Sequence, residues 1–441
     1  MVNFYHLCRV ADPEAETAAH REFCRGRDIR GRIYLSWQGI NAQLSGTRED
    51  AHAYAEWVAG RPGFGGLAWR TERVPAHMFP RLTLKFRESL ISMAGGTKHL
   101  PVGEEGYLPE HLEPGQWREM IRAARAVRAG AGLGDGVDLG ALPAPVAERA
   151  GKSALDEIVV LDLRNDYEWD VGHFEGADRP RESRFSETPT ESTDDLQVPA
   201  YMEGKDKDTP VMMYCTGGIR CDVYAAHLRT MGYRNVYALG GGVHRYFEEV
   251  GGDEWDGSLY VFDGRVAVPA ERPEESERRW REGREGEVGS LEGHVPGRVN
   301  SCLAHGQTSP FRGLRAAAGC RVCGGEAEAP PINCANIDCN RIFLACPGCK
   351  QRLLGCCGRE CVEAPRLRRP VQDAPGNYAK WNKYAPEGER INESRIGRRR
   401  RERRARKSRE AAEAKREQRE ARKEMAAAAM RDSAGGGGGG A

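Results

Sequence analysis

The chain has 441 residues, of which 39% are hydrophobic and 30% are charged, and its formal net charge is +1. At roughly 100–200 residues per domain, this length predicts two or three domains. No stretch approaches the ~20 apolar residues of a transmembrane helix, which excludes a protein with a membrane-spanning helix. The first residues, MVNFYHLCRV, show neither a signal-peptide nor a transit-peptide pattern. We therefore expect a cytoplasmic or organellar protein without a membrane partner.

Residues 1–105 predict a ferredoxin- or acylphosphatase-like α+β domain. Thr47 opens an expected helix, and Asp50 completes an approximate capping box. We expect strands at 2–10, 32–35, 42–44, 67–74 and 82–86, and helices at 14–27 and 47–58. The order β-α-β-β-α-β is the split βαβ arrangement of ferredoxin-like domains.

Residues 106–255 predict a doubly wound parallel sheet. Three short, almost fully apolar runs, EIVVLDLR, VMMYC and NVYAL, alternate with expected helices at 114–127 and 220–231. Such runs are typical of strands that are buried on both faces. We interpret 128–150 and 179–208 as surface insertions, because the first is rich in glycine and alanine and the second is polar.

Basic charge and cysteine are concentrated toward the C-terminal end of the chain. We expect a linker or extension at 256–300, a cysteine-rich module at 301–365 and a disordered basic tail at 366–441. Residues 398–409 read RRRRERRARKSR and carry +8, which leaves −7 on the rest of the chain. One interpretation is that this run contacts RNA phosphates. The alternatives are a nuclear address and a merely solvated tail. The predicted phosphate contacts are Arg398, Arg399, Arg400 and Arg401.

The loop that begins at Cys215 carries the clearest chemical signal. This cysteine ends a buried strand, two glycines follow it, and Arg220 opens the next helix. Ligands of open α/β sheets bind at this edge, where loop N–H groups and the helix dipole favour an anion. We therefore expect a pKa below ~8.5 for the Cys215 thiol. The remaining residues of the expected active-site loop are Thr216, Gly217, Gly218 and Ile219.

The spacing between Cys215 and Arg220 gives a loop that suits a persulfide or another compact group better than a phosphate. Cys221 follows directly, near the start of the expected helix. It is either a resolving thiol, which forms a disulfide with an oxidised or persulfidated Cys215, or a small residue that packs the helix.

Motifs around this loop resemble a rhodanese domain, whose loop cysteine carries sulfur as a persulfide. The motifs are Asp162-Leu-Arg164-Asn-Asp-Tyr-Glu168, Gly172-His-Phe174, the Cys215 loop and Leu239-Gly-Gly-Gly242. Asp162 and Arg164 match a motif of that family near the catalytic edge. The resemblance therefore implies a catalytic set of Cys215, Arg220, Asp162 and Arg164.

Over residues 1–270 and part of the cysteine-rich region, the chain also resembles the tRNA uridine hydroxylase family. Gln38-Gly-Ile-Asn41, Lys85-Phe-Arg, CTGGIRC and VFDGRVAV carry this similarity. It implies an enzyme that converts the wobble uridine of tRNA to 5-hydroxyuridine, with molecular oxygen as co-substrate and with the loop cysteine required. The alternatives are a sulfurtransferase that takes sulfur from a donor protein or a small thiol, and a metal-dependent adaptor that is catalytically idle.

The cysteine-rich module predicts two structural zinc ions. Ten of the 14 cysteines lie between Cys302 and Cys361, and paired cysteines supply the thiolates of tetrahedral sites. Nested and interleaved pairing fit the spacing equally well, and free thiols or an iron–sulfur cluster are the alternatives. Interleaved pairing gives one site from Cys320, Cys323, Cys346 and Cys349. It gives a second site from Cys334, Cys339, Cys361 and either Cys356 or Cys357. Of the last two, we include Cys357 among the predicted ligands.

Overall fold

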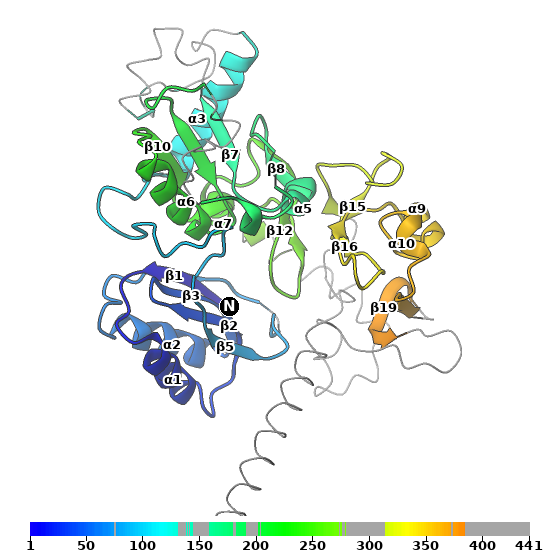
Figure 1. Ribbon diagram of the computed structural model, residues 1–441, viewed down its shortest axis with the longest axis horizontal. Helices are drawn as coiled ribbons and strands as arrows, with labels where there is room; N and C mark the ends of the chain where they lie inside the picture. The colour runs from blue at the N-terminus through cyan, green and yellow to red at the C-terminus, as the bar shows by residue number, and fades with distance from the viewer. Residues whose placement is uncertain are drawn as a thin grey trace, which may run out of the picture.

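The computed structural model describes residues 1–74, 76–130, 158–179, 182–190, 204–272 and 314–371, with isolated positions between them and the backbone of 374–383. Figure 1 shows an N-terminal part in blue, a central part in cyan and green, and a cysteine-rich part in yellow and orange. No helix among the described residues is long and apolar enough to cross a bilayer. The predicted phosphate contacts at 398–401, most of the predicted insertion at 128–150 and part of the one at 179–208 lie outside the described residues.

The N-terminal part has one five-stranded sheet with the strand order β4-β1-β3-β2-β5. Only β5 runs parallel to its neighbour β2, and the other neighbours are antiparallel. This arrangement confirms the ferredoxin-like prediction. The elements are β1 (Val2–Leu7), α1 (Pro13–Phe23), β2 (Ile29–Ser36), β3 (Gly39–Gly46), α2 (Arg48–Ala59), β4 (Arg70–Thr71) and β5 (Leu82–Phe86).

The two faces of this sheet have different surroundings. Val2 and Phe4 of β1 belong to a buried apolar cluster together with Tyr54 and Val58 of α2. Because side chains alternate along a strand, Asn3 and Tyr5 point to the opposite face. Figure 1 shows that both helices cover the face turned away from the central part. The open face therefore looks toward the central domain.

The central part is a four-stranded parallel sheet with the order β6-β10-β9-β7 and helices on both sides. Every residue of β7, β9 and β10 is buried, which confirms the prediction from the apolar runs. We did not predict β6, whose sequence Glu-His-Leu offers one apolar residue. The elements are β6 (Glu110–Leu112), α3 (Pro114–Arg128), β7 (Val159–Asp162), α5 (Asp166–Val171), β8 (Gly172–Phe174), η3 (Phe185–Glu187), β9 (Val211–Tyr214), α6 (Ile219–Thr230), β10 (Val236–Leu239) and α7 (Gly242–Glu249).

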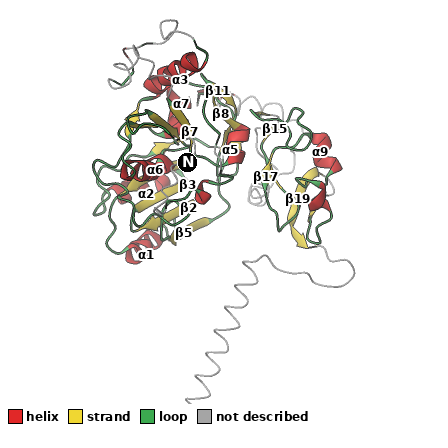
Figure 2. Ribbon diagram, turned by 45° about the horizontal axis from the view of Figure 1, so that its top comes forward, coloured by secondary structure: helices red, strands yellow, loops and turns green. Residues whose placement is uncertain are grey.

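Apart from the ten-residue β19, the remaining elements are short (Figure 2). Residues 256–268, which we placed in the extension, form strands whose Leu259 and Ala267 lie in the core of the central domain. The elements are β11 (Trp255–Gly257), β12 (Leu259–Tyr260), β13 (Ala267–Val268), β14 (Leu314–Arg315), β15 (Glu328–Ala329), β16 (Ile332–Asn333), β17 (Ile342–Phe343), α9 (Pro347–Arg352), α10 (Arg359–Val362), β18 (Arg368–Val371) and β19 (Ala374–Lys383).

Candidate active site and metal centres

A cavity of about 1720 Å³ lies where the three parts meet, and residues of all three line it, among them Tyr5, Cys215 and Arg341. The N-terminal part is fixed to the central part by ion pairs from Arg70 to Glu248 and from Arg265 to Glu72. Pockets for small molecules have volumes of about 300–1,000 Å³. The cavity is therefore large enough for part of a macromolecule.

Cys215 directly follows β9, is buried and lines this cavity. The backbone N–H of Gly218 donates a hydrogen bond to its sulfur over 3.1 Å. Gly218 has a φ of +100°, and a Cβ there would lie 2.8 Å from the Tyr5 hydroxyl. Gly242 of the neighbouring loop also has a positive φ, and its Cβ would lie 2.7 Å from the Cys215 carbonyl oxygen. Glycine at these positions lets both loops and the N-terminal domain approach the sulfur closely.

The surroundings of Cys215 stabilise the thiolate. Burial alone would raise the pKa of this thiol, but a hydrogen bond from Cys221, the charge of Arg220 and the amides of Gly217 and Arg220 outweigh it and lower the pKa to about 6. Burial, and then the hydrogen bond to Cys215, raise the pKa of the Cys221 thiol. At neutral pH the pair therefore consists of an anionic Cys215 and a protonated Cys221.

Arg220 holds the loop through an ion pair that the sequence did not predict. Its guanidinium donates to both carboxylate oxygens of Glu168 over 2.9 and 3.0 Å and to the hydroxyl of Thr216 over 3.1 Å. Burial opposes ionisation of Glu168, but Arg220 outweighs it and lowers the pKa of this carboxyl. Arg220 thus acts on the sulfur through its charge while its hydrogen bonds fix the loop.

The structure places Asp162 and Arg164 beneath the loop rather than in the cavity wall. Both side chains are fully buried and pair with each other at 2.5 Å. Arg164 also donates to the carbonyl of Gly172 over 2.6 Å and lies over the rings of Tyr214 and Trp255. This arrangement fixes the connection from β7 to α5, and a direct catalytic role for the two residues remains a prediction.

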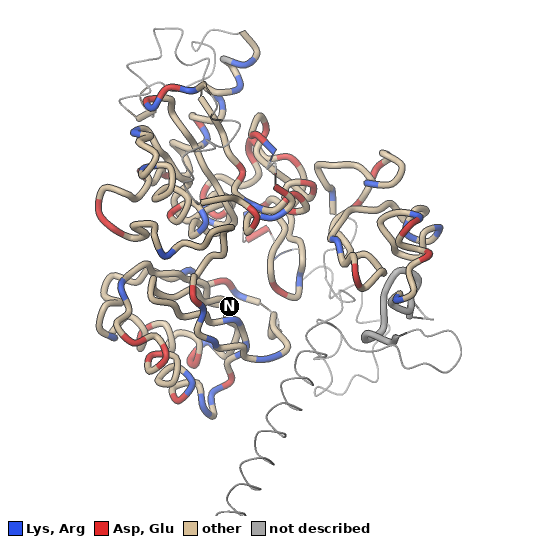
Figure 3. Tube along the Cα trace, in the orientation of Figure 1, with Lys and Arg blue, Asp and Glu red and all other residues tan. Residues whose placement is uncertain are grey.

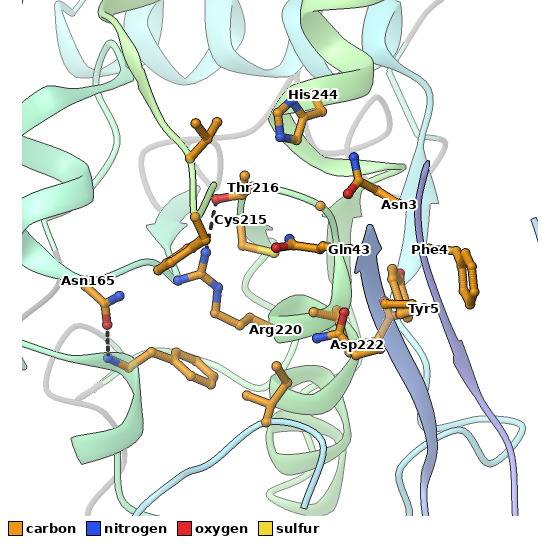
Figure 4. A pocket seen from close by; sticks show the side chains of 18 of the residues that line it. Asn3, Phe4, Tyr5, Gln43, Asn165, Cys215, Thr216, Arg220, Asp222 and His244 are labelled. Atoms are coloured by element: carbon orange, nitrogen blue, oxygen red, sulfur yellow. Dashed lines mark hydrogen bonds between the residues drawn. The ribbon is translucent and has the colours of Figure 1, made fainter. Parts of the chain in front are cut away.

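The sequence did not predict several of the cavity residues, because they lie far from Cys215 in the chain. Figure 4 shows Asn3, Gln43 and His244 around the same space as the sulfur. Burial first, and then the charges of nearby arginines, lower the pKa of His244, so this imidazole is neutral at physiological pH. Tyr5 donates to Asp222 over 2.8 Å.

The eight predicted metal ligands form two groups of four cysteines. Within each group the sulfur atoms lie within 4.8 Å of one another. The sulfurs of Cys323 and Cys346 are 3.8 Å apart, and the sulfur of Cys357 is 3.7 Å from those of Cys339 and Cys361. A tetrahedron with Zn–S bonds of about 2.3 Å has edges of about 3.8 Å, so both groups fit a zinc ion. The groups are Cys320, Cys323, Cys346 and Cys349, and Cys334, Cys339, Cys357 and Cys361.

These groups correspond to the interleaved pairing. Cys356 is buried in the small core of the module and is absent from both groups. Cys339 also lines the large cavity, so the second group borders the same cavity as Cys215. Figure 3 shows lysine and arginine dispersed among acidic residues along the described chain, without a continuous basic stretch.

Comparisons with known proteins agree with this geometry. Residues 1–90 match the UPF0176 acylphosphatase like domain, residues 144–249 the rhodanese-like domain, and residues 298–362 the rhodanase C-terminal domain. The chain is 33% identical over 370 residues to the tRNA uridine(34) hydroxylase of Chlamydia caviae, which covers 83% of this chain and 86% of that protein. The chain belongs to the tRNA uridine(34) hydroxylase family.

Two further relatives also match most of the chain. The tRNA uridine(34) hydroxylase of Protochlamydia amoebophila is 32% identical over 365 residues, which cover 83% of this chain and 88% of that protein. The rhodanese-like domain-containing protein 8, chloroplastic, of Arabidopsis thaliana is 38% identical over 395 residues, which cover 88% and 80%. The three matched segments of this hydroxylase family member correspond to its N-terminal domain, the domain that carries Cys215 and the cysteine-rich module.

Proposed function

We propose that this protein is an enzyme that hydroxylates C5 of the wobble uridine of tRNA. The observation that carries the proposal is a cysteine stabilised as a thiolate in a cavity of about 1720 Å³, in a chain whose relatives are named tRNA uridine(34) hydroxylase. A cavity of this size accommodates a nucleotide that is turned out of its stack, which is how enzymes reach a base.

The reaction replaces the C5–H bond of uracil by C5–OH with molecular oxygen as the oxidant. The balance is uridine plus O2, two electrons and two protons, giving 5-hydroxyuridine and water. Oxidation of two thiols to a disulfide releases two electrons and two protons. Cys215 and Cys221 match this requirement as the reactive thiolate and the resolving thiol, and a small thiol then reduces the pair for the next turnover.

The tRNA backbone needs cationic contacts around the cavity. Arg184 and Arg341 line it, and neither takes part in an ion pair with the described residues. We assign them, together with the basic residues at 398–401, to phosphate binding. In this assignment the cations hold the RNA in place and the cavity selects the base.

Two zinc ions stabilise the cysteine-rich module. Each group supplies four thiolates, which leaves no open coordination position, so the ions are structural. Since Cys339 lines the cavity, the second ion maintains a wall of the active site.

An organellar location is favoured by the chloroplastic relative.

The alternative function, transfer of a persulfide sulfur from Cys215, uses the same compact loop. Nucleoside mass spectrometry of tRNA distinguishes the two, in cells that lack the gene and are complemented with wild type or Cys215→Ser. Restoration of 5-hydroxyuridine by wild type alone supports hydroxylation. Restoration of thiolated nucleosides, with hydroxyuridine unchanged, supports sulfur transfer and overturns the proposal.

A further inference from the structure

The face of the N-terminal sheet that carries no helices has two side-chain amides without a hydrogen-bond partner among the described residues. Asn3 of β1 and Gln43 of β3 are directly opposite each other in the antiparallel register. Both are half-buried and line the cavity, and neither side chain forms a hydrogen bond with another described residue. Because both amides line the cavity, their donors and acceptors are available to a ligand that enters it.

Tyr5 fixes the position of this face relative to Cys215. Its hydroxyl donates to Asp222 over 2.8 Å, and the other oxygen of this carboxylate bonds to His111 over 2.8 Å. A Cβ at Gly218 would meet the Tyr5 hydroxyl at 2.8 Å, and the N–H of Gly218 donates to the Cys215 sulfur. The tyrosine therefore holds the sheet against the catalytic loop.

The strand geometry then places the amides near the sulfur. Asn3 and Tyr5 are two residues apart on the same face of β1, a separation of about 7 Å at ~3.4 Å per residue. Gln43 lies opposite Asn3, and side chains paired in this way are about 5 Å apart. Figure 4 shows Asn3 and Gln43 among the side chains that line the pocket together with the Cys215 sulfur. The two amides thus form a wall that faces the reactive atom.

The chemistry of a carboxamide matches the edge of uracil. That edge presents O4 and O2 as acceptors and N3–H as a donor, while an amide offers an NH2 donor and a carbonyl acceptor. Proteins that bind a base outside its stack read its Watson–Crick edge through such hydrogen bonds. When this edge is bound at the sheet, the C5–C6 side of the ring points away from the sheet, toward the loop of Cys215.

We propose that Asn3 and Gln43 form a pyrimidine-binding subsite that holds the Watson–Crick edge of the uracil while its C5 side faces Cys215. This inference rests on the proposed function and assigns the N-terminal domain a specific part in it. The sheet is then a wall of the active site that selects the base, rather than a separate RNA-binding module.

The test measures binding before catalysis. An anticodon stem-loop RNA with uridine at the wobble position is compared with the same RNA abasic at that position, by fluorescence anisotropy with the full chain. Wild type should prefer uridine. Asn3→Ala and Gln43→Ala should each reduce this preference about fivefold, as expected for one hydrogen bond, while binding of the abasic RNA is unchanged.

Two further variants exclude simpler explanations. Gln43→Glu keeps the size of the side chain and removes the donor, so it should also reduce the preference. Gln351→Ala removes an exposed amide outside the cavity and should leave it unchanged. The alkylation rate of Cys215, measured on every variant, reports whether the loop is intact.

An unchanged preference for uridine in the Asn3→Ala/Gln43→Ala double variant, with the loop intact, overturns the subsite. Failure of the proposed function gives a different result, since wild type would then prefer the uridine RNA without producing 5-hydroxyuridine.

Discussion

Replacement of Cys221 by alanine tests the reasoning about the Cys215 thiolate. The structure attributes the low pKa of Cys215, about 6, in part to the hydrogen bond from Cys221. A hydrogen bond to a charged group contributes about 1.5–3 kcal/mol, and one pKa unit corresponds to ~1.36 kcal/mol. Cys221→Ala should therefore raise the pKa of Cys215 by about one to two units.

This shift changes the charge of the sulfur at neutral pH. With a pKa of about 6, the thiolate fraction at pH 7 is roughly 90%, and after a rise of one to two units it is about 50–10%. The assay is the rate of iodoacetamide alkylation at Cys215 as a function of pH, followed by peptide mass spectrometry, because only the thiolate reacts. Cys221→Ser retains a donor and should shift the midpoint less.

Two results would refute the account of the loop. A wild-type midpoint near the ordinary value of ~8.5 would mean that the amides and Arg220 do not offset burial. An unchanged midpoint in Cys221→Ala would mean that Cys221 does not donate to the sulfur and only packs α6.

Three more predictions concern the metal centres, the buried ion pair and the N-terminal domain. Cys346→Ser should reduce the zinc content from two ions per chain to one, measured by atomic emission, and equal content in variant and wild type would contradict the assignment. Arg164→Met leaves Asp162 charged and unpaired, so it should lower the free energy of unfolding in urea by about 3–5 kcal/mol, whereas a loss below 1 kcal/mol would show that the pair is unimportant. Burial lowers the pKa of His20 to about 4 despite the nearby Glu16. Between pH 6.5 and 4 the unfolded state therefore binds a proton at this histidine that the folded state does not. The free energy of unfolding should fall by up to about 3 kcal/mol as the pH is lowered over this range. His20→Gln, compared over the same range, should show a smaller decrease.

The sequence predicted the elements whose signal is local. The apolar runs that became β7, β9 and β10 could be recognised because their residues are buried on both faces. The Cys215 loop could be recognised because a cysteine, two glycines and an arginine follow a strand. The cysteine pairs of the module likewise lie close together in the chain, although spacing alone did not decide between nested and interleaved sites.

The contacts that complete the site could not be predicted, because they join distant segments. Tyr5 and Asp222 are 217 residues apart, and nothing near either residue indicates the other. Glu168 follows the Asp162–Arg164 motif, but its pairing with Arg220 depends on the packing of α5 against the loop. β6 escaped because its neighbours in the sheet, rather than its own composition, make it a strand.

Oxygen labelling tests the central claim most directly. The purified full chain is incubated with tRNA, a small thiol and heavy-isotope dioxygen, and the nucleosides are analysed by mass spectrometry. The account predicts 5-hydroxyuridine at the wobble position that carries the heavy oxygen, and no such product with Cys215→Ser. Absence of labelled 5-hydroxyuridine with wild type, or equal labelling with Cys215→Ser, would contradict it.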